Sequence, residues 1–410
     1  MSQYLDQRPL DVAIVMFDFG PTGVVRNALR IAGAARRAGL RIELWVAQDK
    51  GTLRGEVPAD VPVISFGATL GCDYTRADRR RAGRATVPAL ASLLDQRQPA
   101  VLMSAGNHFH SFAADAVRAA IFPTRLLLRI STGLPLPQQQ YDPYRWARYL
   151  YKKGKARHRH AVANRLIAVS HEIALELHRD LGADPASIVT IPNGIDQPAI
   201  EKAAAKPFEH AWFAPGAPPV VLGVGRIDKF KNFELLIAAF ARLKSRMPLR
   251  LMILGEERSA WRHRLETQAE RLGVAADVRF EGFTSNPHPY FRHAAAYVCC
   301  SRYEGMSNAM LEAMANGCPV VATRTATGAS ELLDGGTLGP LSAPTTAALA
   351  DAIEARIAAP RDSQRLQARA AEFDLATTIA AYVELLAEEA GRMPLERPLP
   401  APESRKALAA

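Results

Sequence analysis

The chain has 410 residues, 48% of them hydrophobic and 22% charged, and its 51 Lys and Arg against 41 Asp and Glu give a formal net charge of +10. A chain of this length is too long for one ordinary hydrophobic core, so we expect two globular domains. No stretch approaches the roughly 20 apolar residues that span a bilayer, and the N-terminus lacks the apolar core of a signal peptide. We therefore expect a cytoplasmic protein.

The first half of the chain alternates between short apolar runs and helical patterns. Unbroken apolar runs of this length are typical of parallel strands in a sheet that is buried on both faces. The predicted strands are Val12–Phe17, Ile42–Val46, Val101–Ser104, Leu126–Ile130 and Leu166–Val169, and helical periodicity marks Arg26–Ala38 and Ala113–Ile121.

The second half repeats this alternation after residues 197–219, which are rich in Pro and Ala and indicate a linker. The sequence therefore predicts an α/β fold with two doubly wound, Rossmann-like parallel-sheet domains, residues 1–196 and 220–366, that face a cleft at the carboxyl ends of their strands. The predicted strands are Val220–Val224, Leu249–Leu254, Val278–Phe280, Ala296–Cys300 and Pro319–Ala322, with a helix from about Asn232 to Arg246.

Two carboxylates stand on either side of a predicted loop-to-helix junction, Glu304 before it and Glu312 within the helix. Ser307 or Asn308 can cap this helix, and its free N–H groups and positive dipole end favour a phosphate. Glu312, one turn into the helix, can accept hydrogen bonds from the two hydroxyls of a ribose, while Glu304 can reach the hydroxyls of a sugar. The alternative is that both glutamates are merely solvated.

A glycine turn follows the predicted strand Val220–Val224 and presents Arg226 and Lys231. Paired cations at such a turn can stabilise the negative charge that develops on a departing diphosphate. A solvated or helix-capping basic loop is the alternative. The turn includes Gly225 but lacks the third glycine of G-x-G-x-x-G, so a dinucleotide fold is weakly supported.

The segment Glu304–Ala322 resembles, almost position by position, the E-x7-E segment of the retaining GT-B glycosyltransferases of family 4. Residues 225–232, 166–172 and 189–196 also resemble this family, and residues 367–391 resemble its final helix, which crosses back to the first domain. We expect residues 392–410 to be disordered. The resemblance implies transfer of a hexose or N-acetylhexosamine from a nucleoside-diphosphate sugar, with UDP slightly preferred over GDP, to an envelope glycan or lipid-linked acceptor.

The resemblance also implies residue roles, with no cofactor and no metal. Arg226 and Lys231 would bind the diphosphate, Glu304 the donor sugar and Glu312 the ribose. Main-chain groups near the nucleotide would come from the glycine loop at Gly23, the turn at Gly225, the base-binding loop at Phe283, and the helix start at Gly305, Met306, Ser307 and Asn308.

One feature departs from the family. Many members carry a histidine at the end of a strand of the first domain, but the matching strand here ends at Arg129 and Ser131. Either residue could replace the histidine, or the role could move to His108 or His110, which follow the preceding predicted strand. A structural role for each histidine is the alternative.

The positive charge favours a polyanionic neighbour, either nucleic acid or an anionic membrane face. It concentrates in residues 76–84 and 145–159, and in the second cluster aromatic residues alternate with basic ones, as in segments that rest among lipid headgroups. A solvated helix is the alternative. A non-catalytic nucleic-acid-binding protein would leave Arg226, Lys231, Glu304 and Glu312 without a purpose, so we expect no nucleic acid. A nucleotide-sugar 2-epimerase remains the alternative enzyme, and it would act on the donor without an acceptor.

The cysteine and aspartate patterns predict no metal site. The cysteines show neither metal-ligand nor disulfide spacing, so we expect buried thiols, and no two aspartates stand at D-x-D spacing. The charge of a bound diphosphate would then have to be met by side chains and helix ends. The cysteines are Cys72, Cys299, Cys300 and Cys318.

Overall fold

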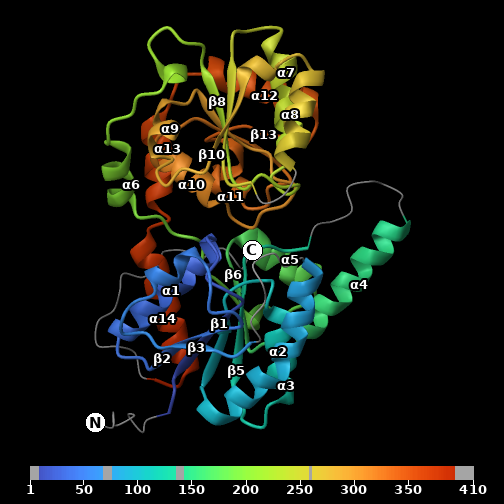
Figure 1. Ribbon diagram of the computed structural model, residues 1–410, viewed down its shortest axis with the longest axis vertical. Coiled ribbons are helices and arrows are strands. Elements are labelled where there is room, and N and C mark those ends of the chain that lie inside the picture. The colour runs from blue at the N-terminus through green and yellow to red at the C-terminus, as the bar shows by residue number, and fades with distance from the viewer. Residues whose placement is uncertain (1–8, 68–75, 135–142, 258–260, 393–410) are drawn as a thin grey trace. The chain divides into compact units, whose positions relative to one another are not determined.

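The computed structural model describes residues 9–67, 76–134, 143–257 and 261–392 (Figure 1). The chain forms two compact units. The first takes the chain up to Val169, then Ala174–Ile191, and the chain from Ala376 onward, and the second takes Ser170–Ile173 and Pro192–Leu375. The predicted disordered tail lies outside the described residues, except for Arg392.

The first unit is built on a parallel sheet with the strand order β3-β2-β1-β4-β5-β6-β7. The sheet is buried on both faces, because the side chains of its central strands are almost fully covered. Its strands are β1 Val12–Met16, β2 Ile42–Val46, β3 Val63–Ser65, β4 Val101–Ser104, β5 Arg125–Ile130, β6 Arg165–Ala168 and β7 Ile188–Thr190.

The second unit has a parallel sheet with the order β10-β9-β8-β11-β12-β13. Each sheet starts from a central strand and winds outward in both directions, so the prediction of two doubly wound α/β domains is confirmed. The strands are β8 Val220–Val224, β9 Arg250–Leu254, β10 Val278–Gly282, β11 Ala296–Cys299, β12 Val320–Thr323 and β13 Leu341–Ser342.

The last helix of the chain packs into the core of the first unit. Tyr382, Val383 and Leu386 of this helix join Ile14 and Ile31 in one hydrophobic cluster. Figure 1 shows it in red beside the blue helix that follows the first strand. The helices that lie wholly or mostly in this unit are α1 Gly23–Arg37, α2 Arg76–Arg97, α3 His110–Ala119, α4 Pro143–His160, α5 His171–Arg179, whose first three residues belong to the second unit, and α14 Leu375–Glu389.

The second unit covers its sheet with helices on both faces, and the segment predicted as a linker belongs to this unit. Residues 197–219 contain α6 Gln197–Ala204 and a 3-10 turn, Ala211–Phe213, rather than only irregular chain. The other helices are α7 Phe233–Lys244, α8 Trp261–Arg271, α9 His288–His293, α10 Asn308–Ala315, α11 Ala329–Leu332, α12 Thr346–Ala358 and α13 Ser363–Ala371.

Three observed strands, β3, β7 and β13, lack the long apolar runs that marked the others. The side chains of β3 and β7 are only partly buried, and β13 holds two residues, so a search for unbroken apolar runs passes over them. Among the described residues, no helix combines the length and the apolar composition that crossing a membrane requires.

Candidate active site

The site of the second unit begins where β8 ends. Gly225 follows this strand with φ +144°, a conformation that L side chains rarely adopt. A Cβ at this position would lie 2.6 Å from Lys231 Cε, so glycine leaves room for the lysine side chain to pass. Gly255, after β9, allows the same close approach, because a Cβ there would lie 1.8 Å from the Gly225 carbonyl oxygen.

The turn after Gly225 is held by Asp228. One carboxylate oxygen accepts hydrogen bonds from the N–H groups of Phe230 at 2.8 Å and Lys231 at 3.2 Å. The other lies 3.7 Å from Arg226 Nη2. The turn ends at Asn232, in the left-handed region with φ +56°, immediately before α7. Asp228 therefore fixes both predicted cationic residues, yet the sequence prediction gave it no role.

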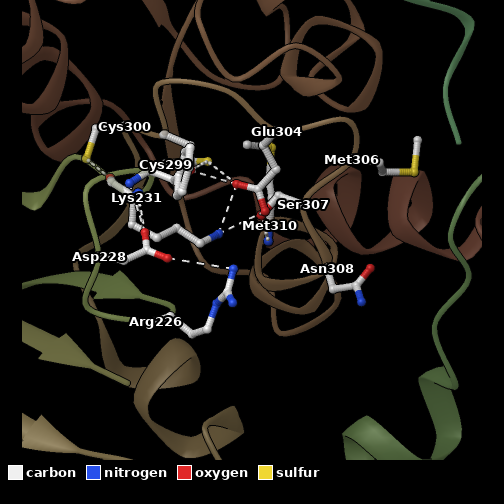
Figure 2. A network of polar contacts seen from close by, with 12 residues as sticks. Arg226, Asp228, Lys231, Cys299, Cys300, Glu304, Met306, Ser307, Asn308 and Met310 are labelled. Carbon is white, nitrogen blue, oxygen red and sulfur yellow. Dashed lines mark hydrogen bonds and ion pairs between the residues drawn. The ribbon is translucent and has the colours of Figure 1, made fainter. Parts of the chain in front are cut away.

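Lys231 and Glu304 form a bidentate ion pair (Figure 2). Lys231 Nζ lies 2.8 Å from Oε1 and 2.9 Å from Oε2 of Glu304, and the Ser301 hydroxyl donates to Oε2 at 2.7 Å. The two side chains are 19% and 20% exposed. Figure 2 shows the Arg226 guanidinium directed toward the same region as the lysine amine. The structure thus joins residues of two segments that are far apart in the sequence.

The charges of this pair support each other. Burial by itself would lower the pKa of Lys231, but the Glu304 carboxylate outweighs that effect and raises the pKa above its ordinary value. Burial would raise the pKa of Glu304, but the charge of Lys231 and hydrogen bonds from Lys231, Ser301 and Ser307 lower it. Both groups are therefore charged at neutral pH.

The start of α10 is capped as the sequence predicts. Ser307 is the N-cap, and its hydroxyl accepts from the N–H of Met310 at 3.4 Å. Asn193 holds the same segment, because its side-chain amide donates to the Met306 carbonyl at 3.2 Å and to Asn308 Oδ1 at 2.9 Å. Asn193 lies in the segment 189–196 that resembles the family, but it received no role in the prediction.

The Gly305 backbone is packed closely against another glycine. The Gly328 N–H donates to the Gly305 carbonyl at 3.1 Å, and a Cβ on Gly328 would lie 2.2 Å from that oxygen. The loop before α10 therefore requires glycine at 328, in a segment that the sequence analysis did not single out.

The remaining predicted donor residues of this unit lie on separate elements. Glu312 is partly buried, one turn into α10. Phe283 follows β10 directly and is 66% exposed, and Gly282 before it has φ +83°. An exposed aromatic ring after a parallel strand is available for stacking with a planar ligand.

The acceptor-side candidates all belong to the first unit. His110 is fully buried: Nε2 donates to the Arg129 carbonyl at 3.1 Å, so Nδ1 accepts from the Ser104 hydroxyl at 2.8 Å. Burial, with the nearby Arg159 charge, holds the pKa of His110 well below its usual value. Arg129 is also buried and donates to Tyr382 Oη at 2.9 Å.

Two predicted residues of the first unit lie closer to its surface. His108, in the loop between β4 and α3, is exposed, so it can reach a ligand more readily than His110 can. Gly23 is the first residue of α1, after the N-cap Thr22. Asn107 beside His108 ties the end of β4 to the end of β5, because its Oδ1 accepts from the Ser131 N–H at 3.0 Å.

The part of the chain that the structure describes holds no group of three or more His, Cys, Asp or Glu that could bind a metal ion. Cys299, Cys300 and Cys318 are buried free thiols, and Cys72 lies outside the described residues. Burial raises the pKa of Cys318 to about 12, so this thiol stays protonated.

Comparison with known proteins identifies the family. The model of "Glycosyltransferase Family 4" matches residues 21–197, and that of "Glycosyl transferases group 1" matches residues 218–358. The chain belongs to these GT-B glycosyltransferases, as the resemblance predicted. It is similar to HepE of Anabaena in complex with UDP and glucose, with a TM-score of 0.71 and 20% identity over 92% of this chain and 100% of that one.

Two curated relatives match part of the chain at 40% identity. One is N-acetylgalactosamine-N,N'-diacetylbacillosaminyl-diphospho-undecaprenol 4-alpha-N-acetylgalactosaminyltransferase of Campylobacter jejuni, matched over 27% of this chain and 30% of that protein. The other is the lipopolysaccharide core biosynthesis glycosyltransferase LpsE of Rhizobium meliloti, matched over 27% of this chain and 31% of that protein. The chain thus spans about a third of the length of these relatives.

Proposed function

We propose that this protein is a retaining glycosyltransferase that transfers a hexose or N-acetylhexosamine from a nucleoside-diphosphate sugar to an envelope glycan or lipid-linked acceptor in the cytoplasm. The observation that carries this proposal is the convergence of Arg226, Lys231 and Glu304 beside the start of α10. Such a cluster combines fixed cations with free helix N–H groups, the two features that favour a diphosphate.

Lys231 is suited to bind the leaving diphosphate because Glu304 does not occupy all of its N–H donors. An ammonium group has three N–H donors, of which two point to the Glu304 oxygens. The third remains for a phosphate oxygen. Arg226, whose side chain is 48% exposed, adds a planar fork that can bind two phosphate oxygens at once.

Glu304 takes a double role in this proposal. Its carboxylate orients the amine of Lys231 and is itself held by Ser301. Lys231, Ser301 and Ser307 already use the about four acceptor positions of this carboxylate, so a hydroxyl of the donor sugar would take the place of a serine hydroxyl. The role predicted for Glu304 is therefore extended, because the residue positions the lysine as well as contacting the sugar.

The nucleoside would contact the remaining predicted donor residues of the second unit. Glu312 would accept hydrogen bonds from the ribose hydroxyls, and the segment at Phe283 would contact the base, with UDP preferred over GDP. Main-chain groups of Gly305, Met306 and Ser307 would approach the diphosphate at the helix start.

For the chemical step we propose front-face attack. The acceptor hydroxyl oxygen bonds to the anomeric carbon while the bond from that carbon to the diphosphate oxygen breaks, and the departing oxygen takes the hydroxyl proton. Configuration is then retained without an enzymic nucleophile. The names of the two curated relatives, which concern a diphospho-undecaprenol glycan and the lipopolysaccharide core, support an acceptor of the envelope class.

The first test replaces Arg226 by alanine. Turnover of the nucleotide sugar should fall by about 10²–10³, as expected when one preorganised charge donor is removed. The matched control is Arg262→Ala on α8, whose partner is Glu266 on the same helix, and it should leave turnover unchanged. Turnover of Arg226→Ala within twofold of the unmodified enzyme would remove this residue from the leaving-group site.

The second test separates the two glutamates by calorimetry with UDP, with GDP as the comparison. Glu312→Gln should weaken UDP binding, because hydrogen bonds to a charged acceptor are roughly twice as strong as neutral ones. Glu304→Gln should change UDP affinity less and transfer more. The reverse pattern would exchange the two roles, and tighter binding of GDP would reverse the nucleotide preference.

A further inference from the structure

Helix α4 of the first unit is anchored along one face. Tyr149 and Ala156 on that face are buried, and Arg157 near its C-terminal end donates to the carbonyls of Leu181 and Asp180, each at 3.2 Å. Arg118 of α3 donates to the His158 carbonyl at 3.1 Å. The helix is thus fixed by its inner face and its C-terminal half, and Figure 1 shows its other end extending away from α2 and α3.

The opposite face of α4 carries apolar side chains in solvent. Tyr144, Leu150 and Tyr151 are 75%, 59% and 63% exposed, and Ala147 between them is exposed as well. Residues 144, 147 and 151 follow the spacing that places side chains on one face of a helix. We call Tyr144, Ala147, Leu150 and Tyr151 the outer stripe. Trp146 lies at its edge, 40% exposed, with its ring against that of Tyr149.

Basic side chains flank the outer stripe, and α4 itself carries no acidic residue. Arg148, Lys152 and Lys155 are exposed along one side, and Lys155 Nζ lies 4.8 Å from the centre of the Tyr151 ring. The 18 residues of α4 contain neither Asp nor Glu. Two acidic residues near the helix, Asp180 and Glu176, act on Tyr149 of the buried face, where burial and then their charges raise the pKa of that phenol.

We propose that the outer stripe of α4 is a docking face for an anionic lipid surface. Amphipathic rings and a leucine would enter the headgroup layer while the flanking cations approach the lipid phosphates, an arrangement typical of helices that lie in a membrane interface. A nucleic acid would satisfy the cations but would leave Leu150 without an apolar environment. This proposal deepens the proposed function and rests on it, because a membrane surface would present a lipid-linked acceptor.

The structure changes which side chains in and beside the cluster 145–159 would contact the lipid. The aromatic residues that alternate with basic ones in this cluster are Trp146, Tyr149 and Tyr151, but Tyr149 is buried inside the unit. Tyr144 and Leu150 take its place in the outer stripe. The basic residues 76–83 have no described side chains and contribute nothing to this proposal.

The test measures partition of the full-length protein into sedimented vesicles, either of phosphatidylcholine alone or with phosphatidylglycerol added. Each basic residue near an anionic surface strengthens binding about fivefold. The triple variant Arg148→Gln, Lys152→Gln and Lys155→Gln should therefore bind anionic vesicles on the order of a hundredfold more weakly at low salt. The matched control, Lys202→Gln, Lys206→Gln and Arg271→Gln, removes the same charge from exposed sites outside α4 and should bind as the unmodified protein does.

The apolar part of the outer stripe is tested at high salt, where screening over about 8 Å or less weakens the charge contribution. The double variant Tyr144→Ser and Leu150→Ser should lose the binding that remains, while Leu272→Ser, an exposed leucine of the second unit, should not. Circular dichroism and melting temperature show that each variant is folded.

Failure of this proposal can be told apart from failure of the proposed function. Arg226→Ala should bind vesicles normally while its transfer activity falls, so vesicle binding is scored without catalysis. Equal binding to neutral and anionic vesicles, unchanged binding of the α4 triple variant, or binding to polyuridylate in preference to vesicles would each overturn the docking face. Dimerisation that the Tyr144→Ser and Leu150→Ser variant abolishes, seen by sedimentation velocity, would assign the face to a second copy instead.

Discussion

Glu304 and Glu389 are carboxylates that each lie against basic side chains, but they are satisfied in different ways. Glu389, at the end of α14, is 2% exposed, and its two oxygens meet Arg125 Nη2 at 2.5 Å and Arg165 Nε at 2.6 Å. Glu304 is 20% exposed and meets one cation, Lys231. One carboxylate is enclosed by two guanidinium groups, while the other shares a single ammonium.

The difference distinguishes a structural contact from a candidate binding site. The two arginines come from β5 and β6, so their bonds to Glu389 fasten the last helix to two strands of the first unit. At Glu304 the lysine keeps one N–H donor, and both side chains remain partly exposed. A partly exposed ion pair whose cation keeps a donor can hold a ligand, whereas a carboxylate that two arginines enclose holds the fold.

The largest effect is expected from Lys231→Met. This change removes the ammonium group but keeps a flexible side chain, and turnover should fall by about 10²–10³, or roughly 2.7–4 kcal/mol in the barrier. Steady-state assays with the nucleotide sugar measure it. Glu389→Gln is the matched control for loss of a buried charge pair, and its turnover should stay within about threefold of the unmodified enzyme. Equal losses in both variants would mean that the Lys231 pair is as structural as that of Glu389.

The second effect concerns stability. Glu389→Gln leaves Arg125 and Arg165 with one neutral acceptor group, and this should lower the free energy of unfolding of the first unit by about 2 kcal/mol, within the range for losing hydrogen bonds to a charged group. Both arginines can recover some hydration because they are partly exposed. Urea unfolding followed by fluorescence measures the change. An unchanged midpoint would show that α14 is held by Tyr382 and Leu386 alone.

The fold was largely predictable because each buried strand is an apolar run. Strands such as Val101–Ser104 match the structure residue for residue, and most others differ at the ends by one or two residues. The predicted helices began or ended a few residues away, since caps such as Thr22 depend on side-chain contacts that periodicity does not report. The segment 197–219 appeared irregular because α6 is short and starts with Gln-Pro.

The candidate site was predictable as separate segments but not as a network. Arg226 and Lys231 follow a glycine turn, and Glu304 precedes a helix cap, which the sequence shows directly. The contact between Lys231 and Glu304 joins positions 73 residues apart, so it depends on β8 and β11 being neighbours in the sheet. Asp228 was the nearest signal that was missed, because an aspartate three residues before a lysine can cap the turn that presents it.

A third acidic cluster, at the start of α5, lies between these two cases. Residues Ser170–Ile173 belong to the second unit, where the His171 N–H and ring Nδ1 meet the two oxygens of Glu331 at 2.8 and 3.0 Å. Burial and then the charge of Glu331 raise the pKa of Glu172 to about 7. The hydrogen bond to Glu331 raises the pKa of His171. This cluster has more carboxylates than cations, unlike those of Glu304 and Glu389.

The smallest effect is therefore a dependence of stability on pH. Between its ordinary pKa near 4.5 and about 7, Glu172 binds a proton in the folded chain but not in the unfolded one, so stability falls as pH rises through this window. His171 acts in the same direction, since its raised pKa stabilises the protonated fold at low pH and that contribution is lost as pH rises through the folded value.

We expect Glu172→Gln to make the melting temperature less dependent on pH between 5 and 8. Allowing for solvent screening of this half-buried group, the change across the window should be about 1 kcal/mol. Glu201→Gln, on the exposed face of α6, is the matched control and should keep the slope of the unmodified protein. Melting curves at constant ionic strength measure both variants. A slope that Glu172→Gln leaves unchanged would mean that Glu172 stays ionised in the fold, and the cluster would then resemble the solvated pairs at the surface rather than the enclosed ones.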